Sequence, residues 1–192
     1  MKIGVLASQG AFIEHITMLN QLGEKASPIR LPDEVNGLDG LIIPGGESTT
    51  ISLLLHGDSL ASEIKKLAEN GLPIMGTCAG MIVLANGVSG STVPSLGLMN
   101  IRVRRNAFGR QRESFETELS IPVLGEDRFP GVFIRAPIIE NSNSNVEILC
   151  RLDDGTSVAA RQGKLLATAF HPELTDDPRL HQYFLEIVAG HI

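Results

Sequence analysis

The chain has few of the residues that secreted, membrane-spanning or nucleic-acid-binding proteins need. It has no tryptophan, one tyrosine and two cysteines in 192 residues, and its formal net charge is −6. Two cysteines are too few to staple a secreted fold, and an acidic chain lacks the basic face of a nucleic-acid binder. No apolar run approaches the roughly 20 residues that cross a bilayer, and the N-terminal one is too short for a signal peptide. We therefore expect a reduced, cytoplasmic protein that binds neither nucleic acid nor membrane.

The residues that are present suit a globular protein with an aliphatic core. Apolar residues make up 43% of the chain, and aromatic residues only 4%. A chain of this length can bury a substantial core, and no linker, internal repeat or composition change divides it. We expect one domain over residues 1–192.

Short apolar runs alternate with helical patterns over the first half of the chain. Within residues 10–22, for example, Phe12, Ile16 and Leu19 recur at the spacing of one helix face. We expect strands at 2–7, 26–31, 38–44 and 72–76, and helices at 10–22, about 47–55, 59–70 and 79–85. This alternation favours a mostly parallel sheet covered by helices on both faces.

The second half has the pattern of strands joined by turns. We expect strands at 97–105, 114–123, 131–139, 146–152, 155–162 and 164–171, and a last helix at about 178–189. The sequences DDG at 153–155 and QG at 162–163 are typical of hairpins. The expected fold is a three-layer α/β fold with extra antiparallel strands in its second half.

The stretch GTCAGM at 76–81 holds one of the two cysteines between glycines, after an apolar run and before a helical pattern. Gly76-x-Cys78-x-Gly80 matches a nucleophile elbow, a sharp turn that strains the backbone of the nucleophile. The N–H groups at the start of the next helix favour a thiolate, and that of Ala79 could bind an oxyanion. The alternative is a small core residue beside helix-packing glycines.

The stretch AFHPEL at 169–174 offers a base for this thiol. His171 follows an apolar run, so we expect it at a strand end, with Glu173 on the same side of an extended backbone. Pro172 is expected to keep that backbone from turning helical at once. The carboxylate could then orient the imidazole while it takes a proton from Cys78. The alternative is a structural or merely exposed histidine.

The stretch IIPGGEST at 42–49 places a glycine pair between a strand and a helix. It lacks the Gly-Lys-Ser/Thr ending of a phosphate-binding loop, and it could be no more than a turn. We interpret it as an anion site at a helix N-terminus, where N–H groups near Gly45 and Gly46 face a developing negative oxygen. Together with Ala79, this loop would complete an oxyanion hole.

Taken together, PGGES, GTCAGM and FHPE resemble the oxyanion loop, cysteine elbow and histidine–glutamate pair of class I glutamine amidotransferase domains. The opening GVLASQGAFIEH, the form PGGESTT and VRRNAFGRQRESFE at 103–116 are similar to the glutaminase subunit of pyridoxal 5′-phosphate synthase. The resemblance covers nearly the whole chain and implies a flavodoxin-like sheet. That family usually has LQG where this chain has SQG at 8–10, which we interpret as a tolerated variant.

The resemblance implies a role for each matching residue. Cys78 would be the nucleophile, His171 the general base and acid, and Glu173 the carboxylate that orients it. Glutamine contacts are implied at Gly46, Glu47, Ser48, Arg105, Ile134 and Arg135, and oxyanion donors at Gly46 and Ala79. The implied reaction is hydrolysis of L-glutamine to glutamate and ammonia, without a cofactor or a metal in this subunit. The ammonia would go to a synthase barrel subunit in a hetero-oligomer that makes pyridoxal 5′-phosphate (vitamin B6).

Other charged and polar residues carry weaker signals. Five arginines lie within eleven residues, and we interpret most of them as a solvated strand face or a partner contact: Arg102, Arg104, Arg105, Arg110 and Arg112. Arg105 breaks the strand alternation, and its guanidinium suits a carboxylate. Cys150 is expected in the core, and His15 in a packing or interface role. No partner pattern accompanies His56, His181 or His191, and no Cys or His pair has metal-ligand spacing.

Three alternatives to this function stay open. The first is a glutaminase subunit of another biosynthetic complex, such as imidazole glycerol phosphate synthase. The second is a non-catalytic regulatory homologue that keeps the fold. The third is a cysteine hydrolase or chaperone of the related flavodoxin-like type, which would not depend on glutamine.

Overall fold

The computed structural model describes residues 1–7, 10–57, 59–90, 94–109 and 113–192, without the side chains of Leu54 and His56. The SQG variant at Ser8 and the interpretations of Arg110 and Arg112 therefore lie outside the described residues. Within them, no helix is both long enough and apolar enough to span a membrane.

Five parallel strands form one half of the main sheet, from the edge strand β2 inward, in the order β2-β1-β3-β4-β12. Their bounds are β1 Lys2–Leu6, β2 Lys25–Ile29, β3 Gly40–Ile43, β4 Ile74–Thr77 and β12 Leu165–Thr168. All residues of β3 and β4 are buried, which explains why both read as continuous apolar runs. The edge strand β2 contains Pro28, a residue that a central strand does not tolerate.

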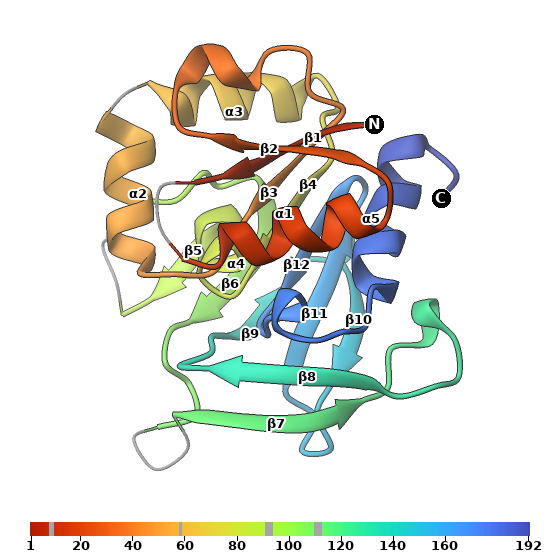
Figure 1. Cartoon of the computed structure of the whole chain (residues 1–192). Helices are drawn as coiled ribbons and strands as arrows, with labels where there is room; N and C mark the ends of the chain where they lie inside the picture. Colours follow the sequence, from red (N-terminus) through yellow and green to blue (C-terminus); the bar gives the residue numbers. More distant parts are fainter. Residues whose placement is uncertain (8–9, 58, 91–93, 110–112) are drawn as a thin grey trace.

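Helices cover both faces of this sheet (Figure 1). A Cβ atom on Gly40 of β3 would meet Val188 and Phe184 of α5, whereas one on Gly76 of β4 would meet Gly80 and Leu84 of α4. Gly76 pairs with Ile43 of β3, which lies three residues beyond Gly40. Successive residues of a strand face opposite sides of the sheet, so Gly40 and Gly76 face opposite sides. Helices α5 and α4 therefore cover opposite faces. The helices are α1 Phe12–Gln21, α2 Ser48–Gly57, α3 Leu60–Glu69, α4 Ala79–Leu84 and α5 Arg179–Ala189.

Beyond β12 the sheet turns mainly antiparallel, as expected. Strands β11, β9, β6 and β5 continue it, and β10 pairs with β11. A separate antiparallel hairpin, β7–β8, packs beside it. The bounds are β5 Ala85–Ser89, β6 Met99–Arg104, β7 Ser114–Leu119, β8 Phe129–Ile134, β9 Ile138–Ser142, β10 Glu147–Arg151 and β11 Ser157–Gln162. Short 3₁₀ helices are η1 Pro32–Val35, η3 Pro122–Leu124 and η4 Pro172–Leu174.

Two strand expectations need correction. The single strand expected at 131–139 is two strands, β8 and β9, that belong to different sheets. Arg135 between them has a positive φ of 45°, and Pro137 follows, so the chain turns there and cannot continue one ladder. Strand β5 was not expected, because ANGVS contains asparagine and glycine, which are depleted in strands, and has little apolar pattern.

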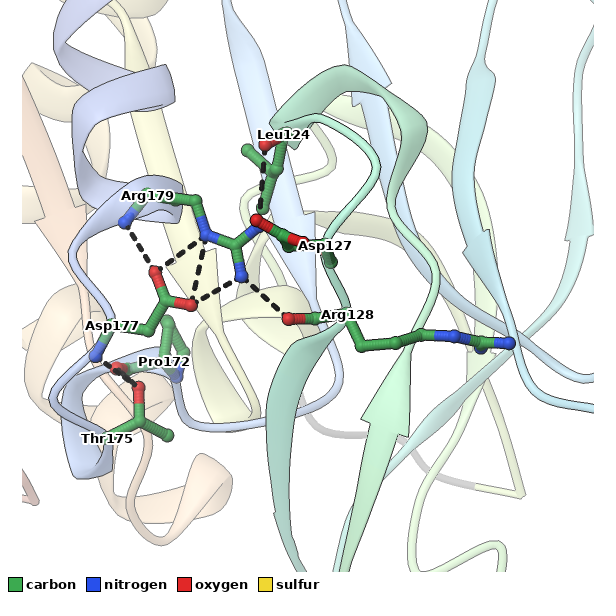
Figure 2. Close-up of polar contacts among 7 residues, drawn as sticks. All are labelled: Leu124, Asp127, Arg128, Pro172, Thr175, Asp177 and Arg179. Atoms are coloured by element: carbon green, nitrogen blue, oxygen red, sulfur yellow. Dashed lines mark hydrogen bonds and ion pairs between the residues drawn. The ribbon is translucent and has the colours of Figure 1, made fainter.

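A cluster around Arg179 ties the start of α5 to the loop that precedes β8 (Figure 2). The guanidinium donates to both carboxylate oxygens of Asp177, at 2.6–3.0 Å, and to the carbonyl oxygens of Asp127 and Arg128, at 2.9 and 2.7 Å. Partial burial opposes ionisation of Asp177, but the bonds from Arg179 outweigh it and lower the pKa of that carboxyl. The cluster thus holds hairpin β7–β8 beside the segment that follows η4.

Replacement of Arg179 by alanine should lower the free energy of unfolding by about 1–2 kcal/mol, since two carbonyls and a carboxylate lose a charged donor. The measurement is urea unfolding at pH 7. Arg128→Ala is the matched control, because the side chain of Arg128 points away from the cluster and only its carbonyl takes part. Equal effects of the two variants would contradict this role.

Candidate active site

A cleft of about 610 Å³ opens at the carboxyl ends of β3, β4 and β12. In a doubly wound sheet this is where the loops after the strands converge and where ligands bind. Gly45 and Gly46 come from the loop after β3, Cys78 from the end of β4, and His171 from the loop after β12. The cleft therefore brings together three stretches that are far apart in the sequence.

Cys78 occupies the strained turn that its glycine-flanked sequence predicts. It lies between β4 and α4 with φ 50° and ψ −103°, a conformation that side-chain-bearing residues rarely adopt. A Cβ atom on Gly76 would come within 2.6 Å of the backbone of Gly80, so strand and helix could not pack this closely with a side chain there. The thiol Sγ lies 3.7 Å from the carbonyl oxygen of Ile134 and faces the cleft.

His171 and Glu173 form a short, buried contact behind the thiol. The ring atom Nδ1 of His171 is 2.7 Å from Oε1 of Glu173, and the Glu173 side chain is fully buried. The extended backbone expected between them is not observed, since Pro172 opens the 3₁₀ helix η4. Proline is favoured at the first position of a helix, so this residue starts the turn that it was expected to prevent.

The charges of this cluster favour an imidazolium. Burial opposes protonation of His171, but hydrogen bonds with Cys78 and Glu173, and the charges of both, raise the pKa of its ring to about 10. Burial likewise opposes ionisation of Glu173, but His15 and His171 outweigh it and lower the pKa of that carboxyl. The ring is therefore cationic at neutral pH.

Gly45 packs closely against the ring of His171. A Cβ atom at this position would come within 2.3 Å of Cε1 of the ring and within 3.0 Å of Nδ1. No other residue leaves room for the imidazole in its observed place. The glycine pair after β3 thus has a packing reason as well as the expected anion-binding one.

The residues for which glutamine contacts were expected all line the same cleft: Gly46, Glu47, Ser48, Arg105, Ile134 and Arg135, together with the oxyanion candidate Ala79. Partial burial opposes ionisation of Glu47, but N–H groups of Thr49 and Thr50 at the start of α2 lower the pKa of its carboxyl to about 2. Arg105 lies 3.3 Å from this carboxylate. The cleft wall therefore carries a fixed anion and a cation side by side.

Two histidines that sequence reasoning set aside lie directly behind this site. His15 of α1 and His181 of α5 are both fully buried, and His15 reaches the second oxygen of Glu173. Their sequence positions hold no pattern that links them, because the contact depends on two helices that share one face of the sheet. The motif signal in GAFIEH, part of the family resemblance, was the one available pointer to His15.

The remaining expectations concern residues away from the cleft. Cys150 is buried in β10, as expected, and burial raises the pKa of its thiol to about 11. Arg102 and Arg104 of β6 are exposed, as expected for a solvated strand face. Among the described residues, no three His, Cys, Asp or Glu side chains are grouped closely enough to hold a metal ion.

The fold is of the class I glutamine amidotransferase type. A solved structure described as a glutamine amidotransferase superimposes with a TM-score of 0.93 at 49% identity, covering 97% of this chain and 98% of its own. The model of the SNO glutamine amidotransferase family matches residues 5–190, and the chain belongs to this family.

Two named relatives cover nearly the same length. A pyridoxal 5′-phosphate synthase subunit PdxT of Dehalococcoides mccartyi is 57% identical over 189 residues, with 97% of each chain aligned. A protein of the same name from Herpetosiphon aurantiacus is 59% identical over 188 residues, with 96% of this chain and 99% of its own aligned.

The raised pKa of His171 predicts how stability depends on pH. Because the folded value of about 10 exceeds the unfolded value of 6.5, the stabilising contribution is complete below pH 6.5 and is lost as pH rises toward 10. The difference in unfolding free energy between wild type and His171→Gln should therefore shrink between pH 7 and 10. Urea titrations at several pH values measure it, and a difference that grows over this range would contradict the assignment.

Proposed function

We propose that this protein hydrolyses the side-chain amide of L-glutamine to glutamate and ammonia. Cys78 is the nucleophile, His171 the general acid and base, and Glu173 the carboxylate that orients it. The observation that supports this assignment is that Cys78 and His171 line one cleft, and that Oε1 of Glu173 lies 2.7 Å from Nδ1 of His171. We also propose that residues 1–192 act as one domain.

The reaction would proceed in two halves. The Cys78 thiolate attacks the amide carbon, a C–S bond forms, and the C–N bond breaks as the His171 imidazolium gives its proton to the leaving nitrogen. Ammonia departs and a γ-glutamyl thioester stays on the enzyme. The neutral ring then takes a proton from water, whose oxygen attacks the thioester and releases glutamate and the thiolate.

Two backbone N–H groups would stabilise the oxyanion formed in each half. That of Ala79 lies at the start of α4, where N–H groups have no partner within the helix. That of Gly46 belongs to the loop after β3, across the cleft. Loss of one such donor typically lowers the rate by roughly 10²–10³-fold.

The neighbouring charges of Glu47 and Arg105 complement a zwitterionic amino acid. Arg105 would bind the α-carboxylate of glutamine, and the ionised Glu47 would lie close to its ammonium group. Ser48, Ile134 and Arg135 complete the wall. A cleft that holds both charges favours glutamine over an uncharged amide of similar size.

We infer that the ammonia is passed to a synthase subunit. The relatives named above are pyridoxal 5′-phosphate synthase subunits by name, and a subunit implies a partner in the same complex. Ile134 and Leu174 at the cleft are each 40% exposed, which suits coverage by a partner. The partner would be the synthase barrel in a cytoplasmic hetero-oligomer, where the free thiols of both cysteines stay reduced.

Replacement of Cys78 by alanine should abolish glutamate release, because no other thiol faces the cleft among its lining residues. Glutamate formation by the purified variant, in the presence of the synthase subunit, is the readout. Cys150→Ala is the matched control and should keep most of the activity, since that thiol is buried in β10. Substantial turnover by Cys78→Ala would refute the assignment.

Glutamine hydrolysis should also depend on the synthase subunit. We expect the isolated chain to release glutamate slowly and the complex to release it several-fold faster, because ammonia production is then coupled to its use. The assay compares glutamate release at equal enzyme concentration with and without the partner. Equal rates would count against coupling.

A further inference from the structure

The carboxylate of Glu173 is contacted on both of its oxygens. His171 lies 2.7 Å from Oε1, and Nε2 of His15 lies 3.3 Å from Oε2. The side chains of His15 and Glu173 are both fully buried. The same His15 nitrogen lies 3.2 Å from Oγ1 of Thr77, and its Nδ1 is 2.9 Å from Nε2 of His181. A continuous line of polar groups therefore runs from the cleft through η4 and α1 to α5.

The ionised carboxylate fixes the proton positions along this line. Among the described residues Oε2 of Glu173 accepts no aligned hydrogen bond, but a lone pair on Nε2 of His15 would face this anionic oxygen at 3.3 Å, so we assign the ring proton to Nε2. In a neutral ring Nδ1 is then an acceptor, and Nε2 of His181 must donate to it. This leaves Nδ1 of His181 as an unprotonated acceptor, which has no hydrogen-bond partner among the described residues. The reverse arrangement would bury an unpaired N–H on His181 and place a lone pair against Glu173.

We propose that His15, oriented by His181, is a positioning residue that holds Glu173 through its second oxygen. The proposal rests on the function proposed above for its effect on activity, although the proton arrangement itself does not. A carboxylate bound at one oxygen can rotate about its last bond, whereas a polar ring packed against the second oxygen restricts that rotation. The plane of the carboxylate in turn fixes the ring of His171, which must face both Cys78 and the leaving nitrogen.

The surroundings of His15 determine how the line responds to pH. Burial lowers the pKa of His15, Glu173 raises it and His171 lowers it, with a smaller raising effect of Glu14 on the same helix. Burial, together with His15, lowers the pKa of His181 to about 3, against a weaker effect of Glu173. The pKa values of both rings are thus lowered, in the direction that the proton arrangement requires.

The proton arrangement can be measured on the isolated chain. Long-range ¹H–¹⁵N correlation on ¹⁵N-histidine-labelled protein at pH 7 should show His15 and His181 as neutral Nε2–H tautomers. The ring signals are assigned by their loss: those of His15 disappear in His15→Gln, and those of His181 disappear in His181→Gln. An Nδ1–H tautomer or a charged ring at either position at pH 7 would overturn the proposal, whatever the activity of the protein.

The effect on catalysis is measured on the complex with its synthase subunit. In His15→Leu we expect kcat to fall about 10–100-fold with KM changed less than about threefold, because the lost contact is with Glu173 and not with substrate. The acid limb of the kcat profile should move up by about one pH unit, since Glu173 loses a donor to its ionised form. In His15→Gln the amide N–H can still reach the carboxylate. This variant should therefore keep most of kcat, and its acid limb should stay close to that of the wild type.

Thr77→Val is the matched control, because it removes the other polar neighbour of the same His15 nitrogen at nearly constant volume. It should leave the acid limb in place. A shift in Thr77→Val as large as in His15→Leu, or an unmoved limb in His15→Leu, would overturn the proposal. Failure of the glutaminase assignment would appear instead as activity in Cys78→Ala, so the two failures are distinguishable.

Discussion

The contact between His171 and Glu173, 2.7 Å long and closed to water, is the interaction on which the rest of the site depends. It keeps a cation beside the thiol in a place where burial alone would discharge the ring. The neighbouring structure is arranged around it: Gly45 leaves room for the ring, and the backbone N–H of His171 donates to the carbonyl of Val132 in β8. A buried ion pair is costly unless its remaining hydrogen bonds are satisfied, and among the described residues Oε2 of Glu173 accepts none and has only the ring of His15 beside it, at 3.3 Å.

Strain around the cleft is local and is supported by the rigid parts of the fold. Cys78, Asn106 and Arg135 have positive φ values, and all three line the cleft. Side-chain-bearing residues keep such conformations only where the surrounding structure forces them. The parallel strands below and the hairpin β7–β8 beside the cleft supply that constraint, with the stacked rings of Phe115 and Phe133 at 4.6 Å inside the hairpin. Favourable packing elsewhere in the fold thus offsets the conformational free energy of the three strained residues at the cleft.

Much of this arrangement could be predicted because its signals are local. Continuous apolar runs mark strands that are buried on both faces, and Gly76-x-Cys78-x-Gly80 marks the turn within five residues, although Gly80 also leaves room for the carbonyl of Ile43 in β3. The break at Arg135 could not be predicted, since a positive φ at arginine is imposed by tertiary structure. The line from Glu173 through His15 to His181 could not be predicted either. Its members are 166 residues apart at the extremes, and only the shared face of α1 and α5 brings them together.

The pairing of β4 with β12 carries a consequence for biosynthesis of the protein. Ile74 is aligned with Leu165, so neighbouring strands at the centre of the sheet are separated by most of the second half of the chain. On the ribosome, the elbow cysteine emerges long before the strand that brings its histidine. The nascent protein therefore carries the thiol without its histidine, and the site can assemble only after β12 and the loop that follows it have been made.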